Sequence, residues 1–194
     1  MVLGASGGEG LRQLCDLISR LPSDLPAAVL IVLHRMADRP SALRSVLARG
    51  AHMPVMIAGQ GDVLQLGVCY IGEPGLHLSL EDGNTARLTL NHLYRNRTID
   101  LLFQSAARTA GARTIGVILA GSLKDGAAGL AAIRRAGGAT LVQTPGDGDA
   151  SDMRRAAIAE VGEPDLVGSV EQVADAITRL TGCGSLGAPQ GVGD

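Results

Sequence analysis

The sequence is almost devoid of aromatic side chains. Its 194 residues include no Trp, two Tyr and one Phe. Proteins that bind single-stranded nucleic acid stack bases on aromatic rings, and nucleic-acid-binding domains carry an excess of basic residues. Here the formal net charge is -2 and the pI is about 6.1. We therefore expect no nucleic-acid partner.

Long apolar runs are also missing. The longest uninterrupted run covers residues 27–33, whereas a membrane-spanning helix needs roughly 20 apolar residues. The first residues lack the basic segment and the apolar stretch of a secretory signal. We expect no membrane insertion and a cytoplasmic protein.

Cysteine is scarce, and its spacing fits neither a disulfide framework nor a zinc site. Cys15, Cys69 and Cys183 are odd in number and far apart, which favours a reducing compartment. No two histidines have the helical spacing of metal ligands, so we expect no metal. Three histidines in polar or turn-rich segments are predicted to be surface or loop residues: His52, His77 and His92.

Glycine and small aliphatic residues are what the chain has in abundance. There are 27 glycines, and short apolar runs alternate with amphipathic segments of helical period. This alternation predicts an α/β fold, a doubly wound and mostly parallel sheet with helices on both faces. Residues 1–181 are predicted to form one domain, and residues 182–194, rich in glycine and without periodicity, a flexible tail.

The expected elements follow from period and from Gly and Pro punctuation. A first strand is expected to end at Val2-Leu3, before a glycine-rich turn, and the sequence leaves open whether this strand is truncated. Other buried strands are expected at 27–33, 114–120 and 139–143, and helices at 11–21, 41–49, 99–110, 126–136, 152–160 and 170–181.

The middle of the chain has shorter apolar runs, separated by turn residues. Four short apolar runs, at 55–58, 68–71, 76–80 and 86–90, are separated by turn residues. Asp82-Gly83-Asn84 is typical of a hairpin turn. We interpret residues 53–90 as an antiparallel segment attached to the parallel sheet, with a hairpin at its end.

Three predicted strands end in residues that can carry chemistry: Ser6, His34 and Asp125. Ligands of open parallel sheets bind at the carboxyl ends of the strands. A hydroxyl, an imidazole and a carboxylate brought together there could form an acyl-transfer triad. Each also has a simpler interpretation, which the sequence leaves open. Ser6 could cap the following helix, His34 could bond the backbone, and Asp125 could cap the helix that begins at Gly126.

Gly7 follows Ser6, at the expected start of a helix. Its backbone N–H could stabilise an oxyanion there. A phosphate or nucleotide site at this turn is a weaker alternative, because the chain has neither a Gly-Lys-Ser/Thr ending nor a full Gly-x-Gly-x-x-Gly.

Six segments occur in a specific order along the chain. They are Gly4-Ala5-Ser6 with the glycines after it, the strand that ends at His34, Glu73-Pro74-Gly75-Leu76-His77-Leu78, Ile99-Asp100-Leu101-Leu102-Phe103-Gln104-Ser105-Ala106-Ala107, the segment from Val117 to Asp125-Gly126-Ala127-Ala128-Gly129-Leu130, and Met153-Arg154-Arg155-Ala156-Ala157-Ile158. Together they resemble the catalytic domain of CheB-type chemotaxis protein-glutamate methylesterases, over nearly all of residues 1–180. The last segment looks like that family's Met-Pro-x-x-Ala-Ile.

The resemblance implies a serine hydrolase with Ser6 as nucleophile, His34 as general base and Asp125 as the acid that orients it. It implies hydrolysis of glutamate methyl esters on a methyl-accepting chemoreceptor in chemotaxis signalling, with release of methanol, and in many members deamidation of receptor glutamines. No cofactor or metal is implied.

The chain departs from the family pattern beside the nucleophile and the acid. Ser6 runs directly into Gly7-Gly8-Glu9, whereas the family has Thr or Ala between the serine and the two glycines. Ser122 stands where the family has an active-site methionine. We place Gly7, Gly8 and Ser122 in the oxyanion and substrate vicinity. These departures leave open a catalytically weak or inactive binding module on the same fold. The resemblance starts at residue 1, without the family's receiver domain, so we expect a stand-alone form, a fragment, or regulation by a separate protein.

Overall fold

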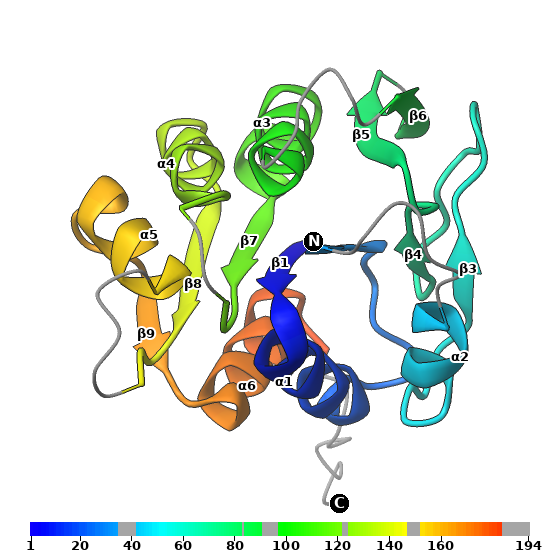
Figure 1. The fold of residues 1–194 in the computed structure, drawn as a ribbon. Coiled ribbons are helices and arrows are strands. Elements are labelled where there is room, and N and C mark those ends of the chain that lie inside the picture. Colours follow the sequence, from blue (N-terminus) through cyan, green and yellow to red (C-terminus); the bar gives the residue numbers. More distant parts are fainter. Residues whose placement is uncertain (35–41, 83, 91–96, 122–123, 147–151, 184–194) are drawn as a thin grey trace, which may run out of the picture.

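A seven-stranded, all-parallel sheet forms the centre of the molecule, in the strand order β3-β4-β2-β1-β7-β8-β9. A separate antiparallel hairpin, β5-β6, lies beside α3 (Figure 1). The computed structural model describes all residues except 35–41, 83, 91–96, 122–123, 147–151 and 184–194.

The strands are β1 Val2–Ser6, β2 Val29–His34, β3 Val55–Ile57, β4 Cys69–Ile71, β5 Leu76–Glu81, β6 Thr85–Leu90, β7 Ile115–Ile118, β8 Ala139–Gln143 and β9 Leu166–Gly168. The helices are α1 Gly7–Arg20, α2 Leu43–Ala48, α3 Thr98–Ala110, α4 Ala127–Arg135, α5 Met153–Val161 and α6 Val170–Leu180, with a short 3-10 helix at Gly111–Arg113.

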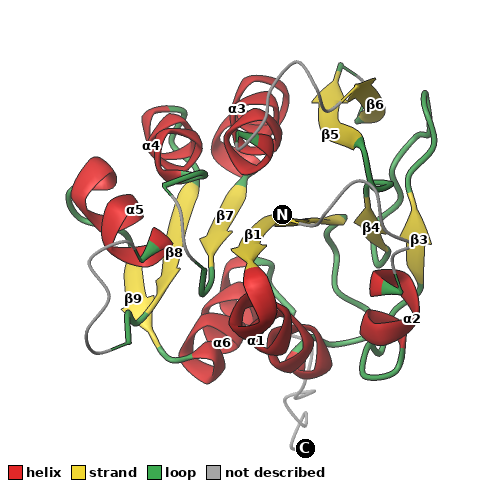
Figure 2. Cartoon of the chain, viewed as in Figure 1, coloured by secondary structure: helices red, strands yellow, loops and turns green. Residues whose placement is uncertain are grey.

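Helices cover both faces of the sheet, as Figure 2 shows: α1, α2 and α6 lie on one side and α3, α4 and α5 on the other. The alternation of side chains along β1 feeds both cores. Leu3 and Ala5 pack with α1 and α6, whereas Val2 packs with α3. The predicted doubly wound α/β fold is confirmed.

Glycine at position 4 lets α3 lie directly on the central strand. A Cβ built on Gly4 would collide with Ile99 Cγ2 and lie 3.3 Å from Ile118 Cδ1. Ile99 is the second residue of α3 and is fully buried. This close approach fixes the beginning of α3 beside the carboxyl end of β1.

The prediction that the first strand ends at Leu3 is wrong. β1 continues through Gly4 and Ala5 to Ser6, paired with β2 along its whole length and with β7 over Val2–Gly4. Hydrogen bonding on both sides holds these small residues extended, so no glycine-rich turn forms before Ser6. α1 accordingly begins at Gly7, four residues before the predicted start at Leu11.

The middle segment is also organised differently from the prediction. β3 and β4 belong to the parallel sheet, and only β5 and β6 are antiparallel. The predicted hairpin therefore exists, although Gly83 in its turn lies outside the described residues. β9, a strand of three residues, was not predicted. Runs this short show no period, and the neighbouring strand decides their direction.

The described part of the C-terminal segment follows α6 directly, and residues 184–194 lie outside the described residues. The division into a domain at 1–181 and a flexible tail at 182–194 stays a prediction. Among the described residues, every helix is too short or too polar to cross a lipid bilayer.

Candidate active site

Ser6 and His34 lie side by side at the carboxyl edge of the sheet. Each is the last residue of its strand, and the parallel register of β1 and β2 pairs them directly. Paired residues of parallel neighbours present their side chains on the same face. That face is the one covered by α3, because Val2, Leu30 and Val32 of the same alternating set pack in the α3 core.

Asp125 reaches His34 from the segment after β7. The distance from His34 Nε2 to Asp125 Oδ2 is 2.6 Å, and the carboxylate is fully buried whereas the imidazole is 18% exposed. In the serine-protease triad it is Nδ1 that binds the carboxylate. Here it is Nε2 that lies against the carboxylate.

Asp125 is held in place by the backbone of α3. Its Oδ2 accepts a hydrogen bond from Ile99 N and its Oδ1 accepts one from Asp100 N, both at 2.9 Å. These are the N–H groups that an N-cap side chain normally satisfies. The predicted alternative, a cap on the following helix, is wrong in its target: the N-cap of α4 is Gly126, and Asp125 caps α3 instead.

Asp100 in turn caps the start of α4, a role that was not predicted from the sequence. Its Oδ1 accepts hydrogen bonds from Gly126 N at 3.0 Å and from Gly129 N at 2.7 Å, at the start of α4. Burial raises the pKa of Asp100, and the negative charge of Asp125 raises it further, against the backbone hydrogen bonds that lower it. Asp100 shares a helical spacing with Phe103 and Ala107, which are buried, and this spacing was the signal in the sequence that Asp100 is buried too.

The floor beneath Ser6 is made by the end of β7 and the residues after it. Ser6 N donates to Ala120 O at 3.2 Å, and Ala120 N donates to the buried Gln143 Oε1 at 3.0 Å. A Cβ on Gly121 would collide with Ser6 Oγ and lie 3.0 Å from Met153 Cε. Gly121 leaves room for the Ser6 side chain, and Gln143 holds the backbone of Ala120 to which Ser6 is bonded. Neither role was predicted from the sequence.

The first turn of α1 begins immediately after Ser6. Gly7 has a φ of 70°, and both Gly7 and Gly8 are exposed. The first N–H groups of a helix have no partner within it. Ser6 occupies the N-cap position, but among the described residues its side chain makes no capping hydrogen bond to this turn. The predicted oxyanion role of Gly7 and Gly8 stays a prediction.

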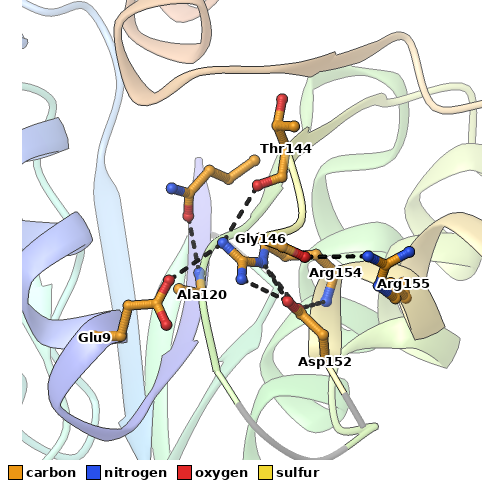
Figure 3. Close-up of polar contacts among 8 residues, drawn as sticks. Glu9, Ala120, Thr144, Gly146, Asp152, Arg154 and Arg155 are labelled. Atoms are coloured by element: carbon orange, nitrogen blue, oxygen red, sulfur yellow. Dashed lines mark hydrogen bonds and ion pairs between the residues drawn. The ribbon is translucent and has the colours of Figure 1, made fainter. Parts of the chain in front are cut away.

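An arginine cluster, defined here as Glu9, Asp152 and Arg154, joins the first turn of α1 to the start of α5 (Figure 3). Arg154 Nε lies 2.8 and 2.9 Å from the two oxygens of Asp152, and its Nη1 lies 3.4 Å from Glu9 Oε1 and 3.3 Å from Thr144 O. Burial alone would raise the pKa of Asp152, but hydrogen bonds from Arg154 bring it below its usual value. The pKa of Arg154 is raised, chiefly by its hydrogen bonds to Asp152.

The remaining predicted positions have mixed outcomes. Ser122 and His92 lie outside the described residues, and His52 is exposed as expected. The prediction for His77 is wrong: it is 1% exposed on β5, because the hairpin packs against α3. The described residues include no group of three or more His, Cys, Asp or Glu side chains that could hold a metal ion.

The chain is similar in sequence to curated proteins of one kind. It is 38% identical over 184 residues to the protein-glutamate methylesterase/protein-glutamine glutaminase 2 of Anaeromyxobacter dehalogenans, covering 93% of this chain and 53% of that protein. It is 35% identical over 192 residues to the protein-glutamate methylesterase/protein-glutamine glutaminase of Moorella thermoacetica, covering 95% and 45%. The chain thus spans about half the length of these relatives.

A solved structure supports the same assignment. The catalytic domain of the Thermotoga maritima CheB methylesterase superposes with a TM-score of 0.81 at 26% identity, covering 92% of this chain and 96% of that one. The family model described as CheB methylesterase matches residues 1–177. The chain belongs to the CheB methylesterase family.

Proposed function

We propose that this chain is a serine hydrolase that removes methyl groups from glutamate γ-methyl esters of a chemoreceptor. The observation that carries the proposal is the His34–Asp125 pair at 2.6 Å, on the strand end next to Ser6. A base that is oriented by a buried acid and adjacent to a serine is the arrangement that activates a hydroxyl for acyl transfer.

In the proposed mechanism Ser6 Oγ attacks the ester carbonyl while His34 Nδ1 takes the hydroxyl proton. The N–H groups at the start of α1 face the oxyanion that develops. His34 then gives the proton to the departing methoxide, which leaves as methanol. Water hydrolyses the acyl-enzyme by the same base, which regenerates Ser6 and releases a glutamate carboxylate. A glutamine amide could follow the same path with ammonia as the leaving group.

Asp125 suits its proposed role because backbone N–H groups and His34 hold both of its oxygens. Three donors fix its two oxygens, and two of them are backbone amides. The carboxylate is therefore held in a fixed position, as the proposed role of orienting His34 and stabilising its imidazolium requires.

The proposed substrate is a side chain on a macromolecule, and the exposure of the site favours this. Gly7 and Gly8 are exposed and His34 is partly so. Exposed residues next to buried Ser6 suit an ester presented on a receptor helix. The names of the relatives include both methylesterase and glutaminase activity. The chemoreceptor partner, a separate regulatory protein and the cytoplasmic location stay predictions.

The proposal is tested by methanol release from methylated receptor membranes, with Ser6→Ala as the matched variant. We expect release by the parent chain and loss of at least about a thousandfold in Ser6→Ala. A fluorophosphonate probe should label the parent chain at Ser6 only. Methanol release that is unchanged in Ser6→Ala would overturn the proposal, and a parent chain that the probe does not label would favour the inactive binding module.

A further inference from the structure

The segment that follows β7 leaves the sheet directly beside Ser6. Leu119 N still donates to Gly4 O at 2.9 Å, in the register that pairs Gly4 with Ile118. In a continued parallel ladder Ser6 N would donate next to Leu119 O. It donates instead to Ala120 O, at 3.2 Å. The hydrogen bonding therefore skips one residue, and the backbone bends at Ala120.

The hydrogen bond from Ala120 to β8 departs from the ladder at the same place. The register of β7 and β8 pairs Ile118 with Val142, so in a continued ladder Ala120 N would donate to the backbone oxygen of Gln143. It donates instead to the side-chain oxygen of Gln143, Oε1, at 3.0 Å. Gln143 is the last residue of β8 and is 8% exposed, and Ala120 is fully buried. A side chain thus takes the place of a strand carbonyl at the bend.

The bend brings the Gly121 backbone against the proposed nucleophile. A Cβ built on Gly121 would collide with Ser6 Oγ and lie 2.8 Å from Ser6 N. Gly121 O accepts a hydrogen bond at 2.9 Å from Met153 N, at the start of α5. The two residues of the bend, Ala120 and Gly121, are therefore held from β1, β8 and α5. Of these three hydrogen bonds, only the one to Gln143 uses a side chain.

We propose that Gln143 is a positioning residue: its side-chain oxygen keeps the backbone bent at Ala120 and so sets the place of Ser6 for attack. Without that acceptor the buried Ala120 N loses its partner, and the regular ladder to the backbone oxygen of Gln143 becomes the alternative. Gly121 then leaves its place against Ser6. The inference rests on the proposed function, because it assigns a consequence for the reactivity of Ser6.

The test is the rate at which a fluorophosphonate probe labels Ser6, separated into the maximal rate and the half-maximal concentration. Gln143→Met fills a similar space without a strong acceptor. We expect its maximal rate to fall about tenfold, with the half-maximal concentration unchanged, because Gln143 acts through the Ala120 backbone. Gln143→Glu loses the same amide N–H groups as the methionine variant but keeps the oxygen, so it should restore most of the rate.

A matched control lies on the same strand as Gln143. Thr140 is fully buried, and its Oγ1 donates to Asp165 Oδ2 at 2.8 Å. Thr140→Val keeps the shape of the side chain and removes this buried hydrogen bond. It should lower the melting temperature and leave the labelling rate at the parent value. If Gln143 had only a structural role, Gln143→Met would behave as Thr140→Val does.

The outcomes separate the inference from the proposed function. Should Gln143→Met fail to fold, Gln143→Asn carries the same comparison, because its amide is one methylene shorter and reaches less far toward Ala120 N. Three results overturn the inference alone: a parent-like rate in the folded variant, a slow rate that Gln143→Glu does not restore, or a change confined to the half-maximal concentration. A parent chain without labelling at Ser6 overturns the proposed function and the inference together.

Discussion

Two pairs of acidic side chains lie near Ser6, and the two pairs are stabilised in opposite ways. On the His34 side, Asp100 and Asp125, called here the backbone-held pair, accept hydrogen bonds from N–H groups at the starts of α3 and α4. On the other side, Asp152 and Glu9 share the guanidinium of Arg154. The first arrangement fixes the carboxylates with backbone N–H groups, whereas the second places a guanidinium between them. Only the first is suited to support an imidazolium.

Exchanging each acid for its amide should give the largest contrast between the two sides. Asp125→Asn keeps the shape of the side chain but removes the charge that faces His34, so we expect kcat to fall about a thousandfold or more. Asp152→Asn should lower kcat by less than about tenfold, because Asp152 binds Arg154 and is not one of the three proposed catalytic residues. Methanol release and probe labelling measure both. Equal losses in the two variants would remove the distinction between the sides.

The two sides should also respond to pH with opposite sign. Asp100 has a raised pKa, so the folded chain binds its proton more tightly than the unfolded chain does, and stability is lost as pH rises through that pKa. Asp152 has a lowered pKa, so its contribution is present above the usual aspartate range and is lost as pH falls through the folded value.

Thermal melting of the amide variants between pH 3 and pH 7 measures this difference. Relative to the parent chain, Asp100→Asn should gain stability as pH rises, since asparagine keeps the acceptor oxygen for Gly126 and Gly129 without the charge. Asp152→Asn should lose stability over the same rise. Parallel curves for the two variants would contradict the assignment.

The smallest effect is expected at Arg97, an exposed cation beside Asp100 of the backbone-held pair. Arg97 Nε lies 4.0 Å from Asp100 Oδ2, and the arginine side chain is 64% exposed. Exposed ion pairs contribute little, so Arg97→Gln should change the free energy of unfolding by less than about 0.5 kcal/mol and leave probe labelling unchanged. A larger loss in urea unfolding would mean that this pair depends on a cation as the arginine cluster does.

The sequence predicted the positions of Ser6 and His34 because parallel strands bring their carboxyl ends to one edge. That rule needs only the two strands, and both exist, although β1 runs three residues beyond its predicted end. It also brought Asp125 to the same edge, although the helix that Asp125 caps was predicted wrongly. Local reasoning looks for a capping residue next to its helix, and here α3 is capped by a residue from the far side of β7.

The supporting residues escaped prediction for the same reason. Arg154 and Glu9 are 145 positions apart, and Gln143 and Ala120 are 23 apart. No period or spacing in the sequence joins such pairs. One signal was present in the sequence: Arg154 follows Met153, where the similar family segment has Met-Pro. An arginine in place of that proline at the start of a helix adds a positive charge, and a charge that becomes buried needs a partner.

The reciprocal capping of α3 and α4 has a consequence for how the site can be moved or lost. Each helix start is completed by a carboxylate that the other helix region carries, so local opening of either one should release both. Protection of the Ile99, Asp100, Gly126 and Gly129 amides from hydrogen exchange would then rise and fall together. The position of Asp125 depends on the starts of both α3 and α4, and not on its own loop alone. If the segment after β7 were transplanted into another sheet without α3, its carboxylate would therefore not be held in the same position.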